Sequence, residues 1–328
     1  MKSGIDWQKT EIGSFEAITR ELIFEAMDLI RPHLSASSAS KIVRENGDQV
    51  LAKFEDENPT GAFKIRGGLV YFDWLKTTHP EIKSVITATR GNHGQSVAFG
   101  AGKAHINARI VVPFGNSPSK NEAMRQLGAE VIEYGRDFVE AMDFAITEAN
   151  STGSHFIPSF DWKLVLGVST YGFELFSGHP GIDTVYVPIG LGSGICGTIA
   201  ARNAVGSSAK IIGVVSEKAP AYAKSFAAGE VRISEETPDT IADGVAVRVP
   251  NDDSFSVIRK YVDDIVTVPE SGIREAIREL HKVTGKRIEG AGAIGYAAWR
   301  NAERGRFQNP AVIISGGNID DVIFDGIV

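Results

Sequence analysis

The feature that most constrains this chain is an alternation of short β-rich runs with longer helical stretches from about residue 84 onward. Such alternation is typical of parallel sheets covered by helices on both faces. With 328 residues the chain is too long for one typical core, so we predict an α/β fold with two lobes, each a mostly parallel sheet flanked by helices. The runs with buried-strand character are SVITAT (84–89), RIVVP (109–113), EVIEY (130–134), TVYVPI (184–189), KIIGVV (210–215) and AVIIS (311–315).

Helical segments occupy the stretches between these runs. Residues 271–285 begin at a serine and end at a glycine that follows a basic residue, and both are typical helix boundaries. The first 45 residues also look mainly helical, with residues 15–30 forming one continuous amphipathic segment. In the 271–285 segment, helical spacing predicts a buried face formed by Ile273, Ile277, Leu280 and Val283.

The charge and the cysteine content exclude several classes of function. The net charge is −7 and the basic residues are scattered, which argues against nucleic acid or an anionic membrane surface as a partner. Cys196 is the only cysteine, so neither an intrachain disulfide nor a cysteine-based metal cluster can form, and we expect it to be buried. Because the sequence shows no apolar signal core and no run long enough to span a bilayer, we expect a cytoplasmic protein.

A lysine lies in the loop PTGAFKIRGG (59–68), directly after the strand-like run QVLAKFE. Ligands of open α/β sheets bind at the carboxyl ends of strands, so this loop is a candidate site. Phe63 and Ile65 flank Lys64 at a predicted helix start and partly remove its amine from water. Desolvation lowers the pKa of an amine and favours the neutral form that reacts with carbonyl compounds. Taken alone, the motif is more typical of a surface lysine in an ordinary turn.

The loop TRGNHGQS follows the run at 84–89. Gly91 and Gly94 would expose backbone N–H groups at a helix N-terminus, where an anion such as a carboxylate is stabilised. Asn92 and His93 add side-chain donors. A common Gly-Asn turn with a capping histidine explains the same residues.

The loop PIGLGSGICG (188–197) follows another strand and leads into a predicted helix. Its glycines allow a nest of N–H groups to surround a phosphate at the helix N-terminus. The same residues offer a second interpretation, because Gly192, Gly194 and Gly197 match G-x-G-x-x-G. Glu217 ends the next strand at the spacing of a ribose-binding acid, as in nicotinamide dehydrogenases.

The loop ISGGNIDD (314–321) places Ser315 at the end of the last strand. Its hydroxyl group could bond a ring nitrogen of a ligand, although a Gly-Gly-Asn turn is the ordinary alternative. Together the four loops provide a lysine, a phosphate cradle, an anion-binding loop and a ring-nitrogen partner. Pyridoxal phosphate needs all four, whereas a dehydrogenase would use only the glycine loop.

In order and spacing these loops resemble the fold-type II pyridoxal-phosphate enzymes, in particular their serine/threonine dehydratase and serine racemase branch. The resemblance covers roughly residues 20–322 and includes the segments TIADGV (240–245) and IEGAGA (288–293). It implies a fold of the tryptophan synthase β type, with a large domain over residues 1–83 and 160–328 and a small domain over residues 84–159. It also implies a homodimer, a pyridoxal 5'-phosphate cofactor and a small amino-acid substrate.

The resemblance assigns roles to single residues. Lys64 would be the Schiff-base lysine, with Phe63 beside the cofactor ring. Asn92 would bond the phenolic oxygen of the cofactor and Ser315 its pyridine nitrogen. The cofactor phosphate would be held by Gly190, Leu191, Gly192, Ser193 and Gly194. The substrate would be bound by Thr89, Arg90, Gly91, His93 and Gly94, with its carboxylate on the backbone of this loop.

Arg90 departs from the family pattern, which has Ser-Ser-Gly-Asn-His at this point. In the racemases the replaced serine resembles an acid–base group on the cofactor face opposite the lysine. Arginine is always protonated and is a poor proton donor, so its presence argues against racemisation. It would bind an anionic or bulky group of the substrate, or pair with an acidic residue, and the sequence leaves both open.

Two other departures concern the glycine loop and a metal site. Leu191 and Ser193 stand where the family tends to have glycine, and the serine can still donate a hydrogen bond to phosphate. The acidic residues that form a divalent-cation site in some relatives align with Val215 and Ala221, so we predict no metal site. The sequence ends at Val328, so we expect no C-terminal regulatory domain.

The function implied by the resemblance is dehydration and deamination of a hydroxy-amino acid to a 2-oxo acid and ammonia. Lys64 would take the α-proton, and the cofactor phosphate would protonate the leaving hydroxyl group. Serine, threonine, 3-hydroxyaspartate and bulkier substrates such as phenylserine share this chemistry. An amino-acid racemase on the same scaffold is the first alternative, and an NAD-dependent dehydrogenase is the second.

Overall fold

The computed structural model describes residues 4–303 and 305–328, and within this part ten strands form two sheets. Every strand pairing is parallel except that of the first two strands. The six-stranded sheet has the order β1 (Ala39–Val43), β2 (Gln49–Phe54), β10 (Pro310–Ile314), β7 (Thr184–Pro188), β8 (Lys210–Ser216) and β9 (Asp264–Val268). The four-stranded sheet has the order β5 (Glu130–Glu133), β4 (Asn107–Val112), β3 (Ser84–Ala88) and β6 (His155–Phe156).

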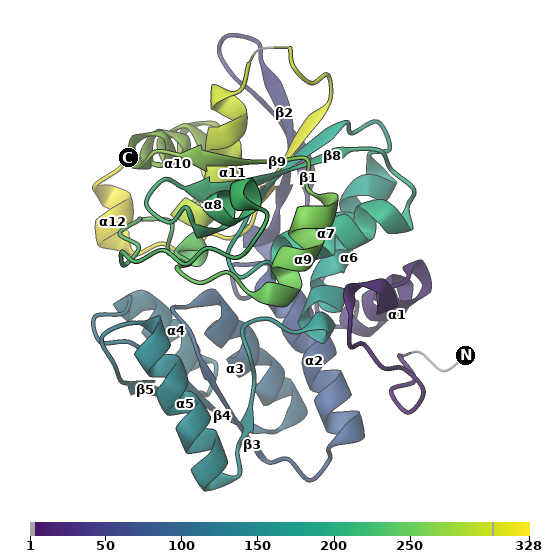
Figure 1. Cartoon of the computed structure of the whole chain (residues 1–328), viewed down its shortest axis with the longest axis vertical. Coiled ribbons are helices and arrows are strands. Elements are labelled where there is room, and N and C mark those ends of the chain that lie inside the picture. The colour runs from purple at the N-terminus through teal and green to yellow at the C-terminus, as the bar shows by residue number, and fades with distance from the viewer. Residues whose placement is uncertain (1–3, 304) are drawn as a thin grey trace.

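Helices connect the strands and cover both sheets, as the alternation predicts. The α-helices are α1 (Arg20–Ile30), α2 (Lys64–Thr78), α3 (Asn92–Ala104), α4 (Pro118–Gln126), α5 (Phe138–Thr152), α6 (Trp162–Gly178), α7 (Ser193–Ala204), α8 (Ala221–Ala228), α9 (Asp252–Tyr261), α10 (Glu270–Thr284), α11 (Gly290–Asn301) and α12 (Asp321–Asp325). Short 3₁₀ helices are η1 (Phe15–Ala17), η2 (Glu55–Glu57) and η3 (Asp243–Val245). In Figure 1 the four-stranded sheet and α3, α4 and α5 form the lower body, and the larger sheet lies above it.

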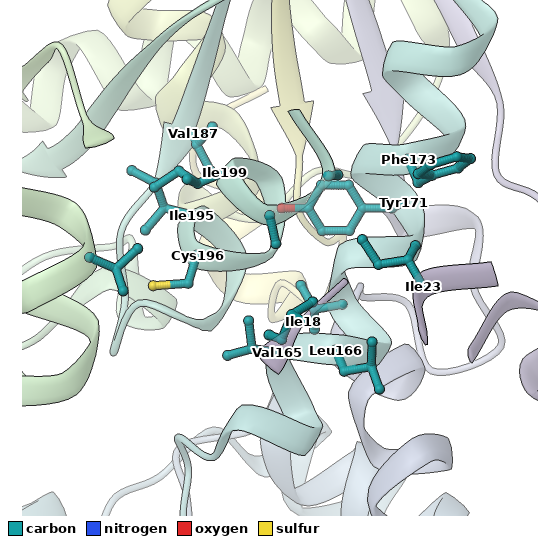
Figure 2. Close-up of a cluster of buried hydrophobic side chains, with 14 of the residues drawn as sticks. Ile18, Ile23, Val165, Leu166, Tyr171, Phe173, Val187, Ile195, Cys196 and Ile199 are labelled. Carbon is teal, nitrogen blue, oxygen red and sulfur yellow. The ribbon is translucent and has the colours of Figure 1, made fainter. Parts of the chain in front are cut away.

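Along the central strands of the larger sheet, successive side chains pack into hydrophobic cores on opposite faces. Val185 and Val187 of β7 pack with α1, α6, α7 and α9, whereas Tyr186 faces α10 and α11 on the other side. Because successive side chains of a strand point to opposite faces, this alternation buries the strand completely. Figure 2 shows the first of these cores, in which α6 and α7 contribute Tyr171, Phe173, Ile195 and Ile199.

Cys196 lies in the same core, on α7, and is fully buried. Burial raises the pKa of its thiol, so the thiol stays protonated and unreactive. The expectation of a small buried residue is therefore confirmed.

The smaller sheet is also covered on both faces. Val85 and Ile110 pack with α2 and α3 on one side, and Ile86 and Val111 pack with α5 on the other. The apolar cluster on the first side includes Tyr71 of α2 and Leu164 of α6, which lie outside residues 84–159. The four strands of this sheet fall between residues 84 and 156, and the exact domain boundaries stay a prediction.

Four local expectations were wrong. The run EVIEY (130–134) forms a strand but not a buried one, because β5 is the edge strand of the smaller sheet and none of its residues is buried. Residues 15–30 do not form one helix, because Thr19 has extended backbone and its side chain accepts a hydrogen bond from the Leu22 N–H, so α1 starts only at Arg20. Residues 39–43 form the edge strand β1, whose five residues bury only Ile42 and so carry no alternating pattern. In α10, Val283 is 45% exposed and Ala276 takes its place on the buried face.

No helix within residues 4–303 and 305–328 combines the length and the apolar character needed to cross a membrane.

Candidate active site

The topology brings the predicted loops to one place. β2, β10 and β7 are parallel neighbours in the larger sheet, so their carboxyl ends meet at one edge. The lysine loop follows β2 after η2, Ser315 follows β10 directly, and the glycine loop 189–192 follows β7. The fourth loop, residues 89–91, follows β3 of the smaller sheet. Hydrogen bonds between these loops show that they lie in contact.

Lys64 is the first residue of α2, and its side chain joins the lysine loop to the glycine loop. The Lys64 Nζ donates a hydrogen bond to Ser193 Oγ over 2.8 Å and lies 5.2 Å from the centre of the Phe63 ring. The side chain is half-buried, and burial lowers the pKa of the Lys64 amine to about 8. A pKa of about 8 leaves a fraction of the amine uncharged and nucleophilic at physiological pH.

The lysine loop and the serine loop run side by side. The Phe63 N–H donates to the Ser315 carbonyl over 3.1 Å, and the Gly317 N–H donates to the Gly61 carbonyl over 2.9 Å. Gly61 has a φ of +66°, and a Cβ there would lie 2.5 Å from Asn318 Oδ1, so only glycine fits. Ser315 is buried next to the lysine loop.

The loop after β3 forms the N-terminus of α3. The Thr89 hydroxyl accepts hydrogen bonds from the N–H groups of Gly91 (2.9 Å) and Gly94 (3.3 Å). The N–H groups of Gly91 and Gly94, which were predicted to bind a carboxylate, therefore already donate to Thr89. The N–H groups of Asn92 and His93 begin the helix and donate to no described residue, so they are the donors left for an anion.

His93 is buried under this loop. Its Nε2 lies 3.1 Å from Thr87 Oγ1. Burial and the charge of Lys64 lower the pKa of His93 to about 3. The imidazole is therefore neutral at physiological pH and adds no charge to the site.

Asn92 is held from both ends of its amide group. Its Nδ2 donates to Glu289 Oε1 over 2.6 Å, and its Oδ1 accepts from Asn318 Nδ2 over 2.8 Å. These contacts fix which end of the amide is the donor and leave one N–H of Nδ2 for a ligand. The structure thus connects the loop TRGNHGQS (89–96) with the loop ISGGNIDD (314–321).

A buried ion cluster contacts Asn92 through Glu289, and the sequence analysis did not predict it. The Lys120 Nζ lies 2.5 Å from Asp243 Oδ2 and 3.4 Å from Glu289 Oε2. Burial alone would lower the pKa of Lys120, but the two carboxylates have the larger effect and raise it. Burial raises the pKa of Glu289. Asp243 and Glu289 lie in the segments TIADGV and IEGAGA, whose resemblance to family segments was the available signal.

The glycine loop has the shape of an anion cradle. Ser193 begins α7, so its N–H and the next two point out of the helix N-terminus without helical partners. Gly192 has a φ of +104°, and a Cβ there would lie 2.4 Å from the Cβ of Ser254. The carbonyl of Leu191 accepts a hydrogen bond from Tyr222 Oη over 3.1 Å, which anchors the loop from outside. A phosphate beside a lysine with a lowered pKa fits this donor set.

The pattern of the family described as "Pyridoxal-phosphate dependent enzyme" matches residues 33–316. The chain belongs to this family. It is 36% identical over 315 residues to the L-threonine ammonia-lyase of Thermotoga maritima, covering 95% of this chain and 78% of that protein. The solved T.th. threonine deaminase matches with a TM-score of 0.84 and 30% identity over 92% of this chain and 99% of the other. Maize serine racemase matches with a TM-score of 0.85 and 28% identity over 94% and 96%.

These matches confirm the predicted family, its two-lobed α/β fold and its pyridoxal-phosphate cofactor, and they identify an enzyme of the ammonia-lyase type. The match includes the glycine loop, so the nicotinamide interpretation is not retained. Glu217, its proposed ribose-binding acid, is exposed. The similar structures include a threonine deaminase and a serine racemase. The substrate and the exact reaction of this chain therefore need a further argument.

Proposed function

We propose that this enzyme converts a small hydroxy-amino acid to a 2-oxo acid and ammonia, with Lys64 as its catalytic lysine. The observation that carries the proposal is the meeting of four loops around a half-buried lysine that is hydrogen-bonded to the glycine loop. The ammonia-lyase relatives support the same reaction type.

Pyridoxal phosphate, when bound, supplies an aldehyde carbon that takes up an amine and a ring that withdraws electrons from the substrate Cα. Ser193 and the N–H groups at the start of α7 would hold its phosphate, together with Gly190, Leu191, Gly192 and Gly194. Asn92 would donate its remaining N–H to the phenolic oxygen, and the Ser315 hydroxyl would bond the ring nitrogen. Lys64 would bond covalently to the cofactor, with Phe63 beside the ring.

The substrate carboxylate is placed by the start of α3. The unpartnered N–H groups of Asn92 and His93 and the positive end of the helix would bind it. Thr89 holds the loop in this shape through its hydroxyl group, so its role is to position the donors. His93 is neutral, so the carboxylate would be held by the helix N-terminus without a charged imidazole beside it.

The elimination requires one proton to leave Cα and one to reach the departing hydroxyl group. The neutral Lys64 Nζ takes the α-proton. The resulting ammonium group can then give a proton to the β-oxygen, as an alternative to the cofactor phosphate that the family resemblance suggests as the donor. Water is lost in this step and taken up again when the product is hydrolysed. The net products are therefore one 2-oxo acid and one ammonia molecule.

The racemase alternative needs a proton donor on the side opposite Lys64. Arg90 stands at the position where the resembling racemases have their serine, and a guanidinium group does not release its proton at physiological pH. We therefore place elimination ahead of racemisation. The test incubates the purified enzyme with a panel of hydroxy-amino acids and measures 2-oxo acid, ammonia and the opposite enantiomer. Equal release of 2-oxo acid and ammonia supports the proposal, and recovery of the opposite enantiomer alone would overturn it.

The lowered pKa of Lys64 predicts a pH dependence. The pKa is about 8 in the folded protein, so the neutral amine is mostly absent below this pH and mostly present above it. The rate at which cofactor-free protein incorporates pyridoxal phosphate covalently should therefore rise with pH to half of its maximum near pH 8. A half-maximum near 10.4, the ordinary value for lysine, would contradict the burial of this amine. Stopped-flow absorbance measures the rate, and Lys64→Ala is the control without this step.

The remaining expectations concern assembly and location. We propose a homodimer in the cytoplasm that binds neither nucleic acid nor membranes, on the basis of the family resemblance and the net charge of −7. Sedimentation equilibrium of the purified protein tests the dimer, and a monomer mass at micromolar concentration would contradict it.

A further inference from the structure

Arg90 is a half-buried cation without a hydrogen-bond or ion-pair partner among the described residues. Its side chain is half-buried, yet it forms no hydrogen bond or ion pair with any residue in 4–303 or 305–328. Among the described residues, Arg248 shares this lack but lies in none of the four ligand loops. The other buried or half-buried arginines are bonded to carboxylates, amide oxygens or carbonyl groups: Arg44, Arg66, Arg109, Arg202 and Arg300.

The position of Arg90 is next to the proposed carboxylate site. It directly follows Thr89 and lies three residues before His93, so it belongs to the same short loop as the free N–H groups of α3. Glu289, the buried carboxylate of this region, is already bonded to Asn92 and Lys120. No described carboxylate oxygen lies within 4.0 Å of Arg90.

A partly desolvated guanidinium group cannot reduce its desolvation cost by losing its proton, because arginine stays protonated in proteins. The charge therefore favours an anion brought by the ligand. The start of α3 already provides for one carboxylate, so Arg90 is available for a second. We infer that Arg90 is a specificity-determining residue that binds a carboxylate on the substrate side chain, so that the enzyme prefers a hydroxy-amino acid of the 3-hydroxyaspartate type.

This inference rests on the proposed function, since it names the substrate class of the same site. A charge-assisted pair of this kind changes binding by about 10- to 100-fold. The expected preference is thus a higher kcat/KM for 3-hydroxyaspartate than for serine or threonine. Arg90→Ala should lower kcat/KM for 3-hydroxyaspartate by that factor and lower the value for serine by a much smaller factor. Arg90→Lys keeps the charge without the two-pronged geometry and should recover part of the loss.

The kinetic test compares the four stereoisomers of 3-hydroxyaspartate with L-serine and L-threonine in the wild type, Arg90→Ala and Arg90→Lys. Arg125→Ala is the matched control, because Arg125 is an exposed arginine of α4, near the same sheet. A selective loss with the dicarboxylic substrate supports the inference. Equal losses with serine and 3-hydroxyaspartate would overturn it, because Arg90 would then bind the carboxylate that all amino acids share. Unchanged kinetics in Arg90→Ala would overturn it as well.

A binding measurement separates this inference from the proposed function. Succinate and butyrate have the same chain length and differ in one carboxylate. Succinate should raise the thermal midpoint of the cofactor-loaded protein more than butyrate does, and Arg90→Ala should abolish the difference. If this difference is found but no hydroxy-amino acid is deaminated, the anion site stands and the proposed function fails. If deamination occurs but succinate and butyrate act alike, the proposed function stands and the inference about Arg90 is wrong.

Discussion

Replacement of Lys64 by alanine should lower kcat by about a thousandfold or more and leave the fold intact. The variant loses the proposed covalent bond to the cofactor and the base for the α-proton, and a positioned base alone contributes roughly 10²–10⁴-fold. The half-buried amine makes its one side-chain hydrogen bond to Ser193, so its removal costs little stability. Release of 2-oxo acid measures the loss, and circular dichroism checks the fold.

Two further variants make this result specific. Lys76→Ala changes an exposed lysine on the same helix, α2, and should keep wild-type activity. Lys64→Arg keeps a positive charge but has no neutral form at physiological pH, so it should be as inactive as the alanine variant. Substantial turnover by Lys64→Ala would mean that another group is the base. Activity of Lys64→Arg would mean that the charge, and not the amine lone pair, matters.

Replacement of Gly192 by alanine should damage both stability and cofactor binding. The left-handed backbone at φ +104° costs a residue with a Cβ about 1–2 kcal/mol. The added methyl group would also lie 2.4 Å from the Cβ of Ser254, and such overpacking costs roughly 1–3 kcal/mol. Because the N–H groups at the start of α7 shift with the loop, the affinity for pyridoxal phosphate should fall at least about tenfold. Urea denaturation and cofactor titration measure the two effects.

Gly206→Ala is the matched control for this variant. Gly206 lies just beyond the other end of α7, has a similarly positive φ of +67° and has nothing within 4 Å of an added Cβ. It should therefore show the backbone cost of about 1–2 kcal/mol without the clash and without a change in cofactor affinity. Equal stability losses in the two variants would show that Ser254 yields and that the clash does not shape the loop.

The sequence predicts the parts of this molecule that depend on local signals. Strands buried on both faces are continuous apolar runs, so β3, β4, β7, β8 and β10 are recognisable without a structure. The loops after them carry glycines and polar residues that point to ligands. The order of the strands in the sheets brings these loops together. Lys64 and Ser193 are 129 residues apart in the sequence, yet their side chains form a hydrogen bond.

The contacts that support the site could not be predicted from the sequence. Lys120 and Glu289 are 169 residues apart and belong to different lobes, so no local pattern pairs them. The edge strand β1 buries one residue of five and therefore resembles a loop. Val283 continues the apolar spacing of α10 but lies at the end of the helix, where it is exposed. In each case tertiary packing decides the outcome.

The absorption spectrum of the purified protein tests the central claim most directly. The wild type, isolated with its cofactor or supplied with pyridoxal phosphate, should show a visible band that is altered in Lys64→Ala and unchanged in Lys76→Ala. Addition of a hydroxy-amino acid that is turned over should shift this band while 2-oxo acid appears. A colourless protein that pyridoxal phosphate cannot reconstitute, or a band that is identical in Lys64→Ala, would contradict the assignment of Lys64 as the cofactor-binding lysine.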